Sequence, residues 1–336
     1  GQIVRAGQRV LCALSGGADS VALAHILRSA ADAAGYEVCA AHVHHGIRAE
    51  SDEEFEFVKS LCDSMDMRLF TTRVDVPQIA QNTGEGIESA ARRVRYEFFY
   101  LTAREQNCDL IALAHHSRDQ AETVLIGLLR SAGLDAIAGM EGSFSRDGVT
   151  FLRPWLDVTR EETTGICEDL GLEWWDDPTN GPDAIREDGL PPNGSLPANY
   201  PLRSRVRHDL MPYLQRFAGG DVVSRLSIGA GLAQTDKDYL NKRAQEIAER
   251  AVTFSEDQVR FSVGVLQSQH EAIRLRVIAH ALGQAGIACS ARHVRQIDRL
   301  ITDWHGQHGV ALPSGYSANR QKHVIRVCQD GGHANR

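Results

Sequence analysis

Short apolar runs alternate with longer segments of helical periodicity through the first half of this chain. The apolar runs are typical of buried strands, and the segments between them repeat apolar residues at the spacing of a helix. The expected strands cover residues 9–14, 37–45, 67–75 and 108–116, and the expected helices cover 19–35, 51–65, 87–106 and 118–133. Strands that alternate with helices predict an α/β fold, in which a Rossmann-like, mostly parallel sheet carries helices on both faces.

The pattern changes in the second half of the chain. A further helix after Thr159 leads into a loop rich in Pro, Gly and Asn at about 181–202, and from about Val222 the spacing is helical again. A chain of 336 residues is too long for one ordinary core. We therefore expect a catalytic domain over 1–217, followed over 218–336 by a helical linker and a small C-terminal α+β domain.

The composition limits which cellular compartment and which classes of binding partner we expect. A net charge of −8 gives no general support to nucleic-acid binding, although short basic runs occur at 203–208 and 320–326. Seven cysteines without a C-x-x-C pair argue against a disulfide framework, a structural zinc site and a cysteine-ligated cluster. No apolar run reaches about 18 residues, and no signal-peptide pattern opens the chain. We expect a cytoplasmic protein with no membrane partner.

The sequence S-G-G-A-D-S stands at Ser15–Ser20, where the first expected strand gives way to a helix. Ligands of parallel sheets bind beyond the carboxyl ends of the strands, and the N–H groups and dipole at a helix start attract anions. Glycines let the backbone approach phosphate oxygens, and the carboxylate of Asp19 suits this place when Mg²⁺ lies between. The alternative is a tight turn with capping residues. The lysine of a Walker loop is missing.

This S-G-G-x-D-S segment resembles the pyrophosphate loop of the N-type ATP pyrophosphatases, the PP-loop superfamily. Further stretches resemble one family of that superfamily, the tRNA(Ile)-lysidine synthetases, over essentially the whole chain. They are H-V-H-H-G-I-R-A-E-S from His42, E-G-I-E-S-A-A-R-R-V-R-Y from Glu85, A-L-A-H-H-S-R-D-Q-A-E-T from Ala112, R-P-W-L-D-V-T-R-E-E from Arg153, W-W-D-D-P-T-N from Trp174 and R-S-R-V-R-H-D-L-M-P from Arg203.

The resemblance implies a ligase that joins lysine to C2 of the wobble cytidine in isoleucine tRNA with a CAU anticodon. ATP and Mg²⁺ are the implied cofactors, an adenylylated tRNA is the intermediate, and AMP and pyrophosphate are released. L-lysine and tRNA(Ile) are the implied partners, with a homodimer as the candidate assembly. Another PP-loop tRNA-modifying enzyme, a thiolase, is the alternative, although the C-x-x-C cysteines usual in such enzymes are missing.

The resemblance also implies roles for individual residues. The expected ATP site is Ser15, Gly16, Gly17, Ala18, Asp19 and Ser20, with His42 as a further contact. The expected catalytic residues are Asp19, Asp119, Arg95 and Arg207, and the expected magnesium ligands are Asp19, Asp119 and Glu122. The expected tRNA contacts are Arg92, Arg203 and Arg205.

Other interpretations of these residues stay open at this point. Asp119 and Glu122 also suit the start of a helix, where acids interact with the dipole, and Arg92 and Arg95 also suit a solvated helix face. The family usually has Asp-Asp-Gln where this chain has Arg118-Asp119-Gln120. In the small domain, the candidate tRNA contacts are chosen by charge alone: Arg292, Arg295, Arg320, Lys322 and Arg326.

Overall fold

The computed structural model describes residues 4–44, 51–175, 195–197 and 200–329, and the chain divides into two compact units, Gly1–Gln234 and Thr235–Arg336. Most of the loop expected at 181–202, and His45, lie outside the described residues. The division falls inside the long helix α10 (Val222–Ala251). The domain boundary expected at residue 217 stays a prediction. None of the described helices offers an apolar stretch that could cross a bilayer.

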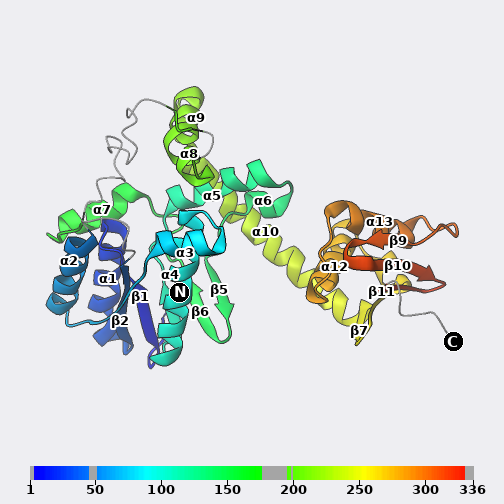
Figure 1. Ribbon diagram of the computed structural model, residues 1–336, viewed down its shortest axis with the longest axis horizontal. Coiled ribbons are helices and arrows are strands. Elements are labelled where there is room, and N and C mark those ends of the chain that lie inside the picture. The colour runs from blue at the N-terminus through cyan, green and yellow to red at the C-terminus, as the bar shows by residue number, and fades with distance from the viewer. Residues whose placement is uncertain (1–3, 45–50, 176–194, 198–199, 330–336) are drawn as a thin grey trace. The chain divides into compact units, whose positions relative to one another are not determined.

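Unit 1 is built around a sheet that, in the described residues, has six strands in the order β3-β2-β1-β4-β6-β5 (Figure 1). All neighbouring strands pair in parallel except β5, which runs antiparallel to β6 at the edge. The strands are β1 (Arg9–Ala13), β2 (Glu37–His44), β3 (Arg68–Arg73), β4 (Leu110–Ala112), β5 (Ser143–Arg146) and β6 (Val149–Leu152). The chain moves outward from β1 to one side and returns to β4 on the other, so the strand order reverses between β1 and β4, where ligands of such sheets bind.

Helices cover both faces of this sheet, as the sequence predicts. The helices of unit 1 are α1 (Ala18–Ala34), α2 (Ser51–Ser64), α3 (Val76–Thr83), α4 (Ile87–Glu105), α5 (Ser117–Arg130), α6 (Leu134–Ile137), α7 (Arg160–Asp169), α8 (Leu202–Arg205), a π-helical turn (Val206–Leu210), α9 (Met211–Ala218) and the start of α10. Successive residues of β1 face opposite cores because strand side chains alternate: Val10 packs with α1, whereas Leu11 packs with Phe99 of α4.

Unit 2 is a one-sided sheet backed by helices. Within the described residues its strand order is β7-β8-β11-β10-β9, all antiparallel. The strands are β7 (Val252–Ser255), β8 (Gln258–Ser262), β9 (Val310–Leu312), β10 (Tyr316–Gln321) and β11 (Val324–Gln329). The helices are α11 (Val263–Gln267), α12 (Glu271–Gln284), α13 (Ala291–Thr302) and a short 3₁₀ turn (Pro313–Gly315). The expected small α+β domain is thus confirmed.

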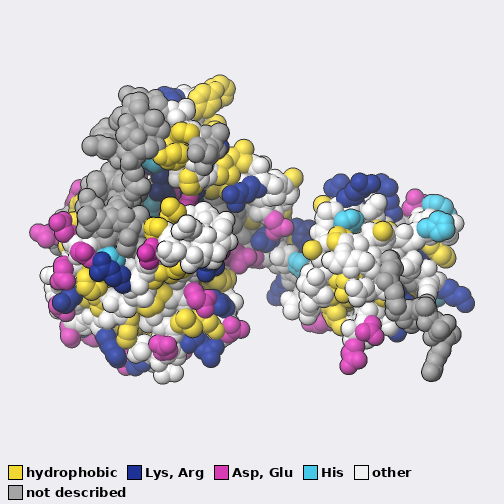
Figure 2. Space-filling view, viewed as in Figure 1, with side chains coloured by type: hydrophobic (Ala, Val, Ile, Leu, Met, Phe, Trp, Pro, Cys, Tyr) yellow, Lys and Arg dark blue, Asp and Glu magenta, His cyan; other side chains and the backbone are white. Residues whose placement is uncertain are grey.

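The two units carry net charges of opposite sign. Unit 1 has 22 Lys and Arg against 34 Asp and Glu, a net charge of −12, and unit 2 has 14 against 10, a net charge of +4. Acidic side chains are scattered over the visible face of unit 1, whereas Lys and Arg side chains gather along one edge of unit 2 (Figure 2). The net charge of the whole chain therefore conceals a basic C-terminal unit.

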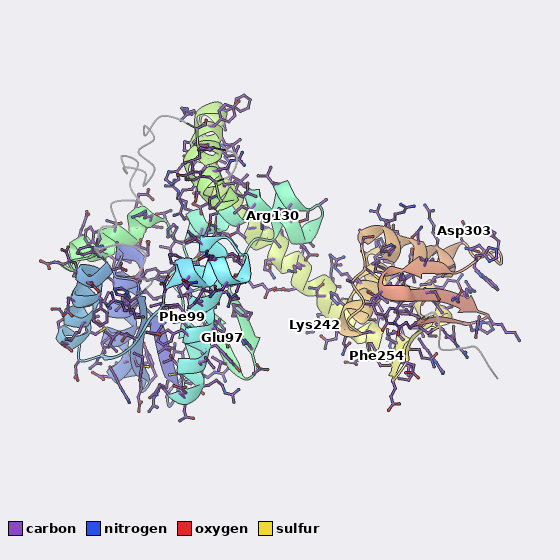
Figure 3. The ribbon with its side chains drawn as sticks, viewed as in Figure 1. Glu97, Phe99, Arg130, Lys242, Phe254 and Asp303 are labelled. Atoms are coloured by element: carbon purple, nitrogen blue, oxygen red, sulfur yellow. The ribbon has the colours of Figure 1, made fainter. Side chains whose placement is uncertain are left out.

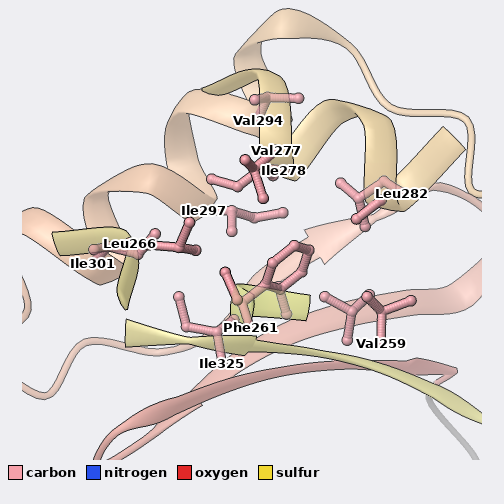
Figure 4. Close-up of a cluster of buried hydrophobic side chains, with 14 of the residues drawn as sticks. Val259, Phe261, Leu266, Val277, Ile278, Leu282, Val294, Ile297, Ile301 and Ile325 are labelled. Atoms are coloured by element: carbon pink, nitrogen blue, oxygen red, sulfur yellow. The ribbon is translucent and has the colours of Figure 1, made fainter. Parts of the chain in front are cut away.

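Each unit has a hydrophobic core of its own. Phe99, on the face of α4 turned toward the sheet, belongs to a core of unit 1 (Figure 3). In unit 2, Phe261 of β8 and Ile325 of β11 lie against Ile278 of α12 and Ile297 of α13, all four fully buried (Figure 4). At roughly 25 cal/mol per Å² of apolar surface, burial of each such side chain contributes about 1.5–3 kcal/mol.

Candidate active site

The segment after β1 forms a tight loop that leads directly into α1. Gly17 is the N-cap residue of α1, and among the described residues no side chain caps its free N–H groups. The loop is closed instead by Ser20, whose Oγ accepts a hydrogen bond from the Ser15 N–H at 3.1 Å and donates one to the Gly17 carbonyl at 2.9 Å. A helix start with uncapped N–H groups is an anion-binding site.

Gly16 is required at the turn of this loop. Its φ of +87° lies in the left-handed region, and a Cβ built there would approach Val58 Cγ2 to 3.2 Å. The Gly16 carbonyl accepts a hydrogen bond from the N–H of Trp175 at 2.9 Å. Gly16 is therefore held between Val58 and the backbone of Trp175, which keeps the N–H groups of the loop in place.

Two of the predicted acids converge on one histidine. Asp19 lies in the first turn of α1 and Asp119 in the first turn of α5, the helix that follows β4. Nε2 of His116 lies 3.7 Å from Asp19 Oδ2 and 3.6 Å from Asp119 Oδ2. Its Nδ1 accepts the Arg118 N–H at 3.2 Å, so in the neutral ring the proton is on Nε2, between the two carboxylates.

Both acids are oriented by further hydrogen bonds. The backbone N–H of His116 donates to Asp119 Oδ2 at 3.2 Å, which completes a capping box at the start of α5. Burial opposes ionisation of Asp119, but His116, His115 and Arg207 outweigh it and hold the pKa of this carboxyl below its ordinary value. The hydroxyl of Thr163, on α7, donates to Asp19 Oδ1.

These residues fit a magnesium ion bound together with a nucleotide. Mg²⁺ in phosphate-transfer sites is held by one or two carboxylates, with phosphate oxygens and waters as the other ligands. Asp19 and Asp119 provide two carboxylates beside the anion-binding loop. In the part of the chain that the structure describes, no group of three or more His, Cys, Asp and Glu side chains could enclose a metal by itself.

Glu122 is fully buried and surrounded by arginines. Arg207, from the π-helical turn, binds it in a bidentate manner, with Nε 2.6 Å from Oε1 and Nη2 3.0 Å from Oε2. Nε of Arg203 lies 3.7 Å from Oε2, and Nε of Arg118 lies 3.9 Å from Oε1. Burial lowers the pKa of the Arg207 guanidinium, yet its hydrogen bonds and charge interaction with Glu122 raise it above the ordinary value.

Arg207 connects this cluster with the acid pair. Its Nη2 also lies 3.4 Å from Asp119 Oδ1. Arg203, on α8, donates to Thr123 Oγ1 at 2.7 Å. Arg205 is the last residue of α8. The structure thus brings Asp19, Asp119, Glu122 and Arg207 together. Arg207 engages both carboxylate oxygens of Glu122. The prediction that Glu122 binds magnesium stays untested.

A second group of basic residues lies on the α4 side of Asp119. Burial lowers the pKa of Arg95, and the charges of Arg92 and Arg203 lower it further against the attraction of Asp119. Among the described residues Arg95 has no hydrogen-bond partner. Nδ1 of His115 is buried without a partner there, and burial, followed by the charge of Arg153, lowers the pKa of His115 to about 3. Arg92, Arg95 and Arg153 therefore place positive charge near Asp119 and His115, and Arg95 has donors available for a ligand.

His42, the further ATP contact that the resemblance implied, lies beside the strand that leads into the loop. Its buried Nδ1 lies 2.9 Å from the carbonyl oxygen of Leu14, at the end of β1. Burial lowers the pKa of this ring, so it is neutral and donates to that carbonyl. The hydrogen bond therefore holds the backbone at Leu14, directly before the loop. A contact between His42 and ATP stays a prediction.

Sequence reasoning missed four residues of this site. His115 and His116 fall in the polar stretch that follows the fourth strand, and the strand end itself was the available signal. Arg153 is buried, donates to the hydroxyl of Tyr96 at 3.2 Å and belongs to the group around His115. Thr163 carries no local signal, because only the packing of α7 on α1 brings it to Asp19.

Comparison with known proteins defines the class first. Residues 2–188 match the PP-loop domain family. The U34-tRNA thiolase NcsA from Methanococcus maripaludis superposes with a TM-score of 0.52 at 16% identity, over 70% of this chain and 74% of that chain, which is a likeness of fold. Unit 1 is a PP-loop domain, the ATP-using domain of the N-type pyrophosphatases, so the predicted α/β fold class is confirmed.

The relatives of the whole chain then define the family. The tRNA(Ile)-lysidine synthase of Bifidobacterium longum subsp. infantis is 49% identical over 97% of this chain and 88% of its own length. The enzyme of the same name from Streptomyces coelicolor is 33% identical over 93% of this chain and 83% of its own length. Residues 261–327 match the TilS substrate binding domain family. The chain belongs to the tRNA(Ile)-lysidine synthase family, and it is a ligase, as the sequence resemblance implied.

Proposed function

We propose that this protein uses ATP to join L-lysine to C2 of the wobble cytidine of isoleucine tRNA with a CAU anticodon. In the first step the C2 carbonyl oxygen attacks the α-phosphorus of ATP, and the bond to pyrophosphate breaks. In the second step a lysine amine attacks C2, the C2–O bond breaks with AMP as leaving group, and the amine loses a proton. Adenylylation is needed because a ring carbonyl oxygen is a poor leaving group.

The observation that carries this proposal is the pair of acids Asp19 and Asp119, in the first turns of α1 and α5. Asp19 and Asp119 lie on either side of His116 Nε2, next to the uncapped N–H groups of Gly17 and its neighbours. The loop Ser15–Ser20 would hold the pyrophosphate part of ATP through these N–H groups. Asp19 and Asp119 would hold Mg²⁺, which when bound neutralises the charge that develops on the departing pyrophosphate.

We assign Arg207 to the transition state and Glu122 to the orientation of Arg207. The bidentate contact with Glu122 fixes the guanidinium plane, and the remaining Nη2 contact directs it toward Asp119 and the reacting phosphate. A planar donor held in this way is suited to charge that spreads over phosphoryl oxygens. Glu122, fully engaged by arginine, then acts as a positioning residue and not as a metal ligand.

The basic group on α4 suits the nucleic acid. Arg95, which has no hydrogen-bond partner in the described part of the chain, provides donors for a phosphate or for the carbonyl of the extruded base, because bases that react are taken out of their stack. Neutral His115 leaves Nδ1 available as a hydrogen-bond partner beside it. Arg92, Arg203 and Arg205 would contact the backbone of the anticodon loop. Cytoplasmic location and a homodimer stay predictions.

The decisive experiment measures incorporation of labelled lysine into tRNA(Ile) with a CAU anticodon, together with release of pyrophosphate, for the full chain with ATP and Mg²⁺. We expect both products from the unmodified protein. Asp19→Asn should lower both rates by a factor of 100 or more, roughly the scale of one essential electrostatic group. Asp32→Asn, on the exposed side of the same helix, is the matched control. Pyrophosphate release without incorporation of lysine would contradict the proposed acceptor.

A further inference from the structure

Two thiol groups outside the candidate active site are in contact with each other. Cys39 lies in β2 and Cys108 in the turn between α4 and β4, and their Sγ atoms are 3.7 Å apart. Both strands pair with β1, and the contact lies near their amino ends, whereas the loop Ser15–Ser20 follows the carboxyl end of β1. The thiol pair is therefore separate from the nucleotide site.

The pair lies just below the surface of unit 1. Both cysteine side chains are buried, but Asn107 and Asp109, on either side of Cys108, are exposed. Asn107 has a φ of +54°, which is typical of a tight turn. The side chain of Arg9, whose charge acts on both thiols, is 40% exposed. A small oxidant therefore has only a surface turn to pass before it reaches the sulfur atoms.

The surroundings of Cys108 favour its thiolate form. A hydrogen bond from Cys39, together with the charge of Arg9, holds the pKa of the Cys108 thiol below its ordinary value against the effect of burial. The hydrogen bond with Cys108 and burial raise the pKa of Cys39, which stays a thiol. The thiolate is the nucleophile in cysteine reactions, so Cys108 is the attacking group and Cys39 provides the second sulfur.

Other cysteines of the chain are in surroundings of the opposite kind. Cys12 and Cys62 are fully buried, and burial raises the pKa of each to about 12. Burial also raises the pKa of Cys289 in unit 2. Buried thiols without a favourable charge nearby are chemically inert. Contact, charge and shallow burial combine at Cys39 and Cys108.

We propose that Cys39 and Cys108 form a reversible disulfide when the protein meets a hydroperoxide. With hydrogen peroxide, the Cys108 thiolate attacks one oxygen, the O–O bond breaks, and the hydroxide that leaves takes up a proton to become water. Cys39 then attacks the sulfur of the Cys108 sulfenic acid, the S–O bond breaks, and a second water leaves with the Cys39 proton. The two thiols lose two electrons and the peroxide gains them.

The turn before β4 is the part that must move for this bond to form. A disulfide has an S–S distance of about 2.05 Å, so the sulfurs, now 3.7 Å apart, must approach by about 1.7 Å. Cys39 is fixed in β2 between β1 and β3, with its Sγ 3.6 Å from the carbonyl oxygen of Val10. Cys108 lies outside the strands, and a shift of its exposed turn brings it to Cys39.

The disulfide would protect the domain from irreversible damage. A sulfenic acid that is not resolved oxidises further to a sulfinic acid, which thiols do not reduce, whereas a disulfide is returned to two thiols by thiol–disulfide exchange. Because the pair and the loop Ser15–Ser20 lie at opposite ends of β1, we expect this protection to leave the nucleotide site unchanged. The inference does not depend on the proposed function.

The test exposes the full chain, in buffer without denaturant, to limiting hydrogen peroxide and maps its thiols by mass spectrometry. All seven cysteines of the reduced chain should react with an alkylating reagent after denaturation, and two fewer should react after oxidation. A linked pair of peptides that contains Cys39 and Cys108 should appear, and dithiothreitol should abolish it. The proposal is overturned if both cysteines stay reduced at a peroxide concentration that already oxidises Cys289 or Cys328.

Three single variants separate the roles of the two thiols. In Cys39→Ser, Cys108 should accumulate sulfenic and sulfinic acid, because no second thiol resolves the first product. In Cys108→Ser, Cys39 should stay reduced, and its oxidation at the rate seen in the unmodified protein would contradict Cys108 as the attacking group. Cys289→Ser, a half-buried cysteine in unit 2, is the matched control and should leave disulfide formation unchanged.

Thermal unfolding shows whether the native fold accommodates the bond. A link between residues 69 positions apart restricts the unfolded chain, so the oxidised chain should keep its circular dichroism spectrum and unfold at the same or a higher temperature. A lower melting temperature after oxidation would overturn the proposal. So would a disulfide that forms in urea but not in the folded protein.

Discussion

At the scale of single residues, the site depends on groups that orient one another and on a buried carboxylate, Asp119, that its neighbours keep ionised. His116 presents its Nε2 proton to two carboxylates because its Nδ1 is occupied by a backbone N–H. Asp119 stays ionised although it is buried, because its neighbours are positive or polar. Asp119 is therefore ready to bind a cation without a change of its own protonation.

Glu122→Gln tests whether this residue orients Arg207 or binds the metal. The variant leaves three arginines near a neutral buried amide, and removal of one partner of a buried ion pair costs about 3–5 kcal/mol of unfolding free energy. We expect this loss in chemical denaturation, together with a large loss of lysine transfer. Glu161→Gln, at an exposed position of α7, is the control for removal of one acid.

The magnesium dependence distinguishes the two roles of Glu122. For a positioning residue, the Mg²⁺ concentration that gives half-maximal pyrophosphate release stays close to that of the unmodified protein in the residual activity. Arg207→Lys keeps the charge of the guanidinium but loses its bidentate geometry, so it should reproduce the loss of activity with a smaller loss of stability. A strong rise in the required Mg²⁺ for Glu122→Gln alone would support a metal ligand instead.

At the scale of elements, the loop is defined by backbone geometry more than by side chains. Gly16 adopts a positive φ and lies against α2, and Gly17 begins α1 in an extended conformation with φ −70°. The first of these conformations is costly for any residue with a Cβ, whereas the second is open to all residues. Backbone conformation therefore requires glycine at position 16 but not at position 17.

Gly16→Ala should destabilise the protein by about 1–3 kcal/mol, the usual cost of a left-handed conformation at a non-glycine residue. It should also raise the KM for ATP, because Val58 would be displaced and the loop shifted. Gly17→Ala is the matched control, since its Cβ would have no neighbour closer than 3.8 Å. Urea denaturation and pyrophosphate release measure the two effects, and equal destabilisation by both variants would contradict the assignment to strain.

At the scale of the whole molecule, buried histidines make stability depend on pH. The pKa of His115 is lowered to about 3 and that of His42 is also lowered, in both cases chiefly by burial. The folded chain therefore binds fewer protons than the unfolded chain below the ordinary histidine pKa of about 6.5. Acidification then favours unfolding, and stability is complete only above that pH.

We expect the unfolding free energy of unit 1 to fall as the pH is lowered from 7.5 to 5, by at most about 1.4 kcal/mol per pH unit for each of these histidines. His115→Gln should make this dependence shallower, because the group that must be protonated on unfolding is removed. His280→Gln, at an exposed position in α12, should leave it unchanged. Equilibrium denaturation at each pH provides the measurement, and an unaltered slope in His115→Gln would show that His115 is not the titrating group.

The sequence by itself determined what depends on local pattern. The four parallel strands β1 to β4 and the helices between them follow from hydrophobic periodicity, and the loop at Ser15–Ser20 follows from its position after the first strand. The pairing of β5 and β6 was not predicted, because each strand has only four residues and β5, at the edge of the sheet, is mostly exposed.

Only the tertiary structure decided which side chains meet. Asp19, His116 and Thr163 come from segments that are far apart in the chain. The position of β4 beside β1 brings His116 to Asp19, and the packing of α7 on α1 brings Thr163 there. The same holds for the arginines: charge alone ranked Arg320 with Arg292, and packing separated them by engaging one with helix carbonyls and leaving the other exposed. Local pattern specifies how each segment folds, whereas contacts between distant segments specify what a charged group is bound to.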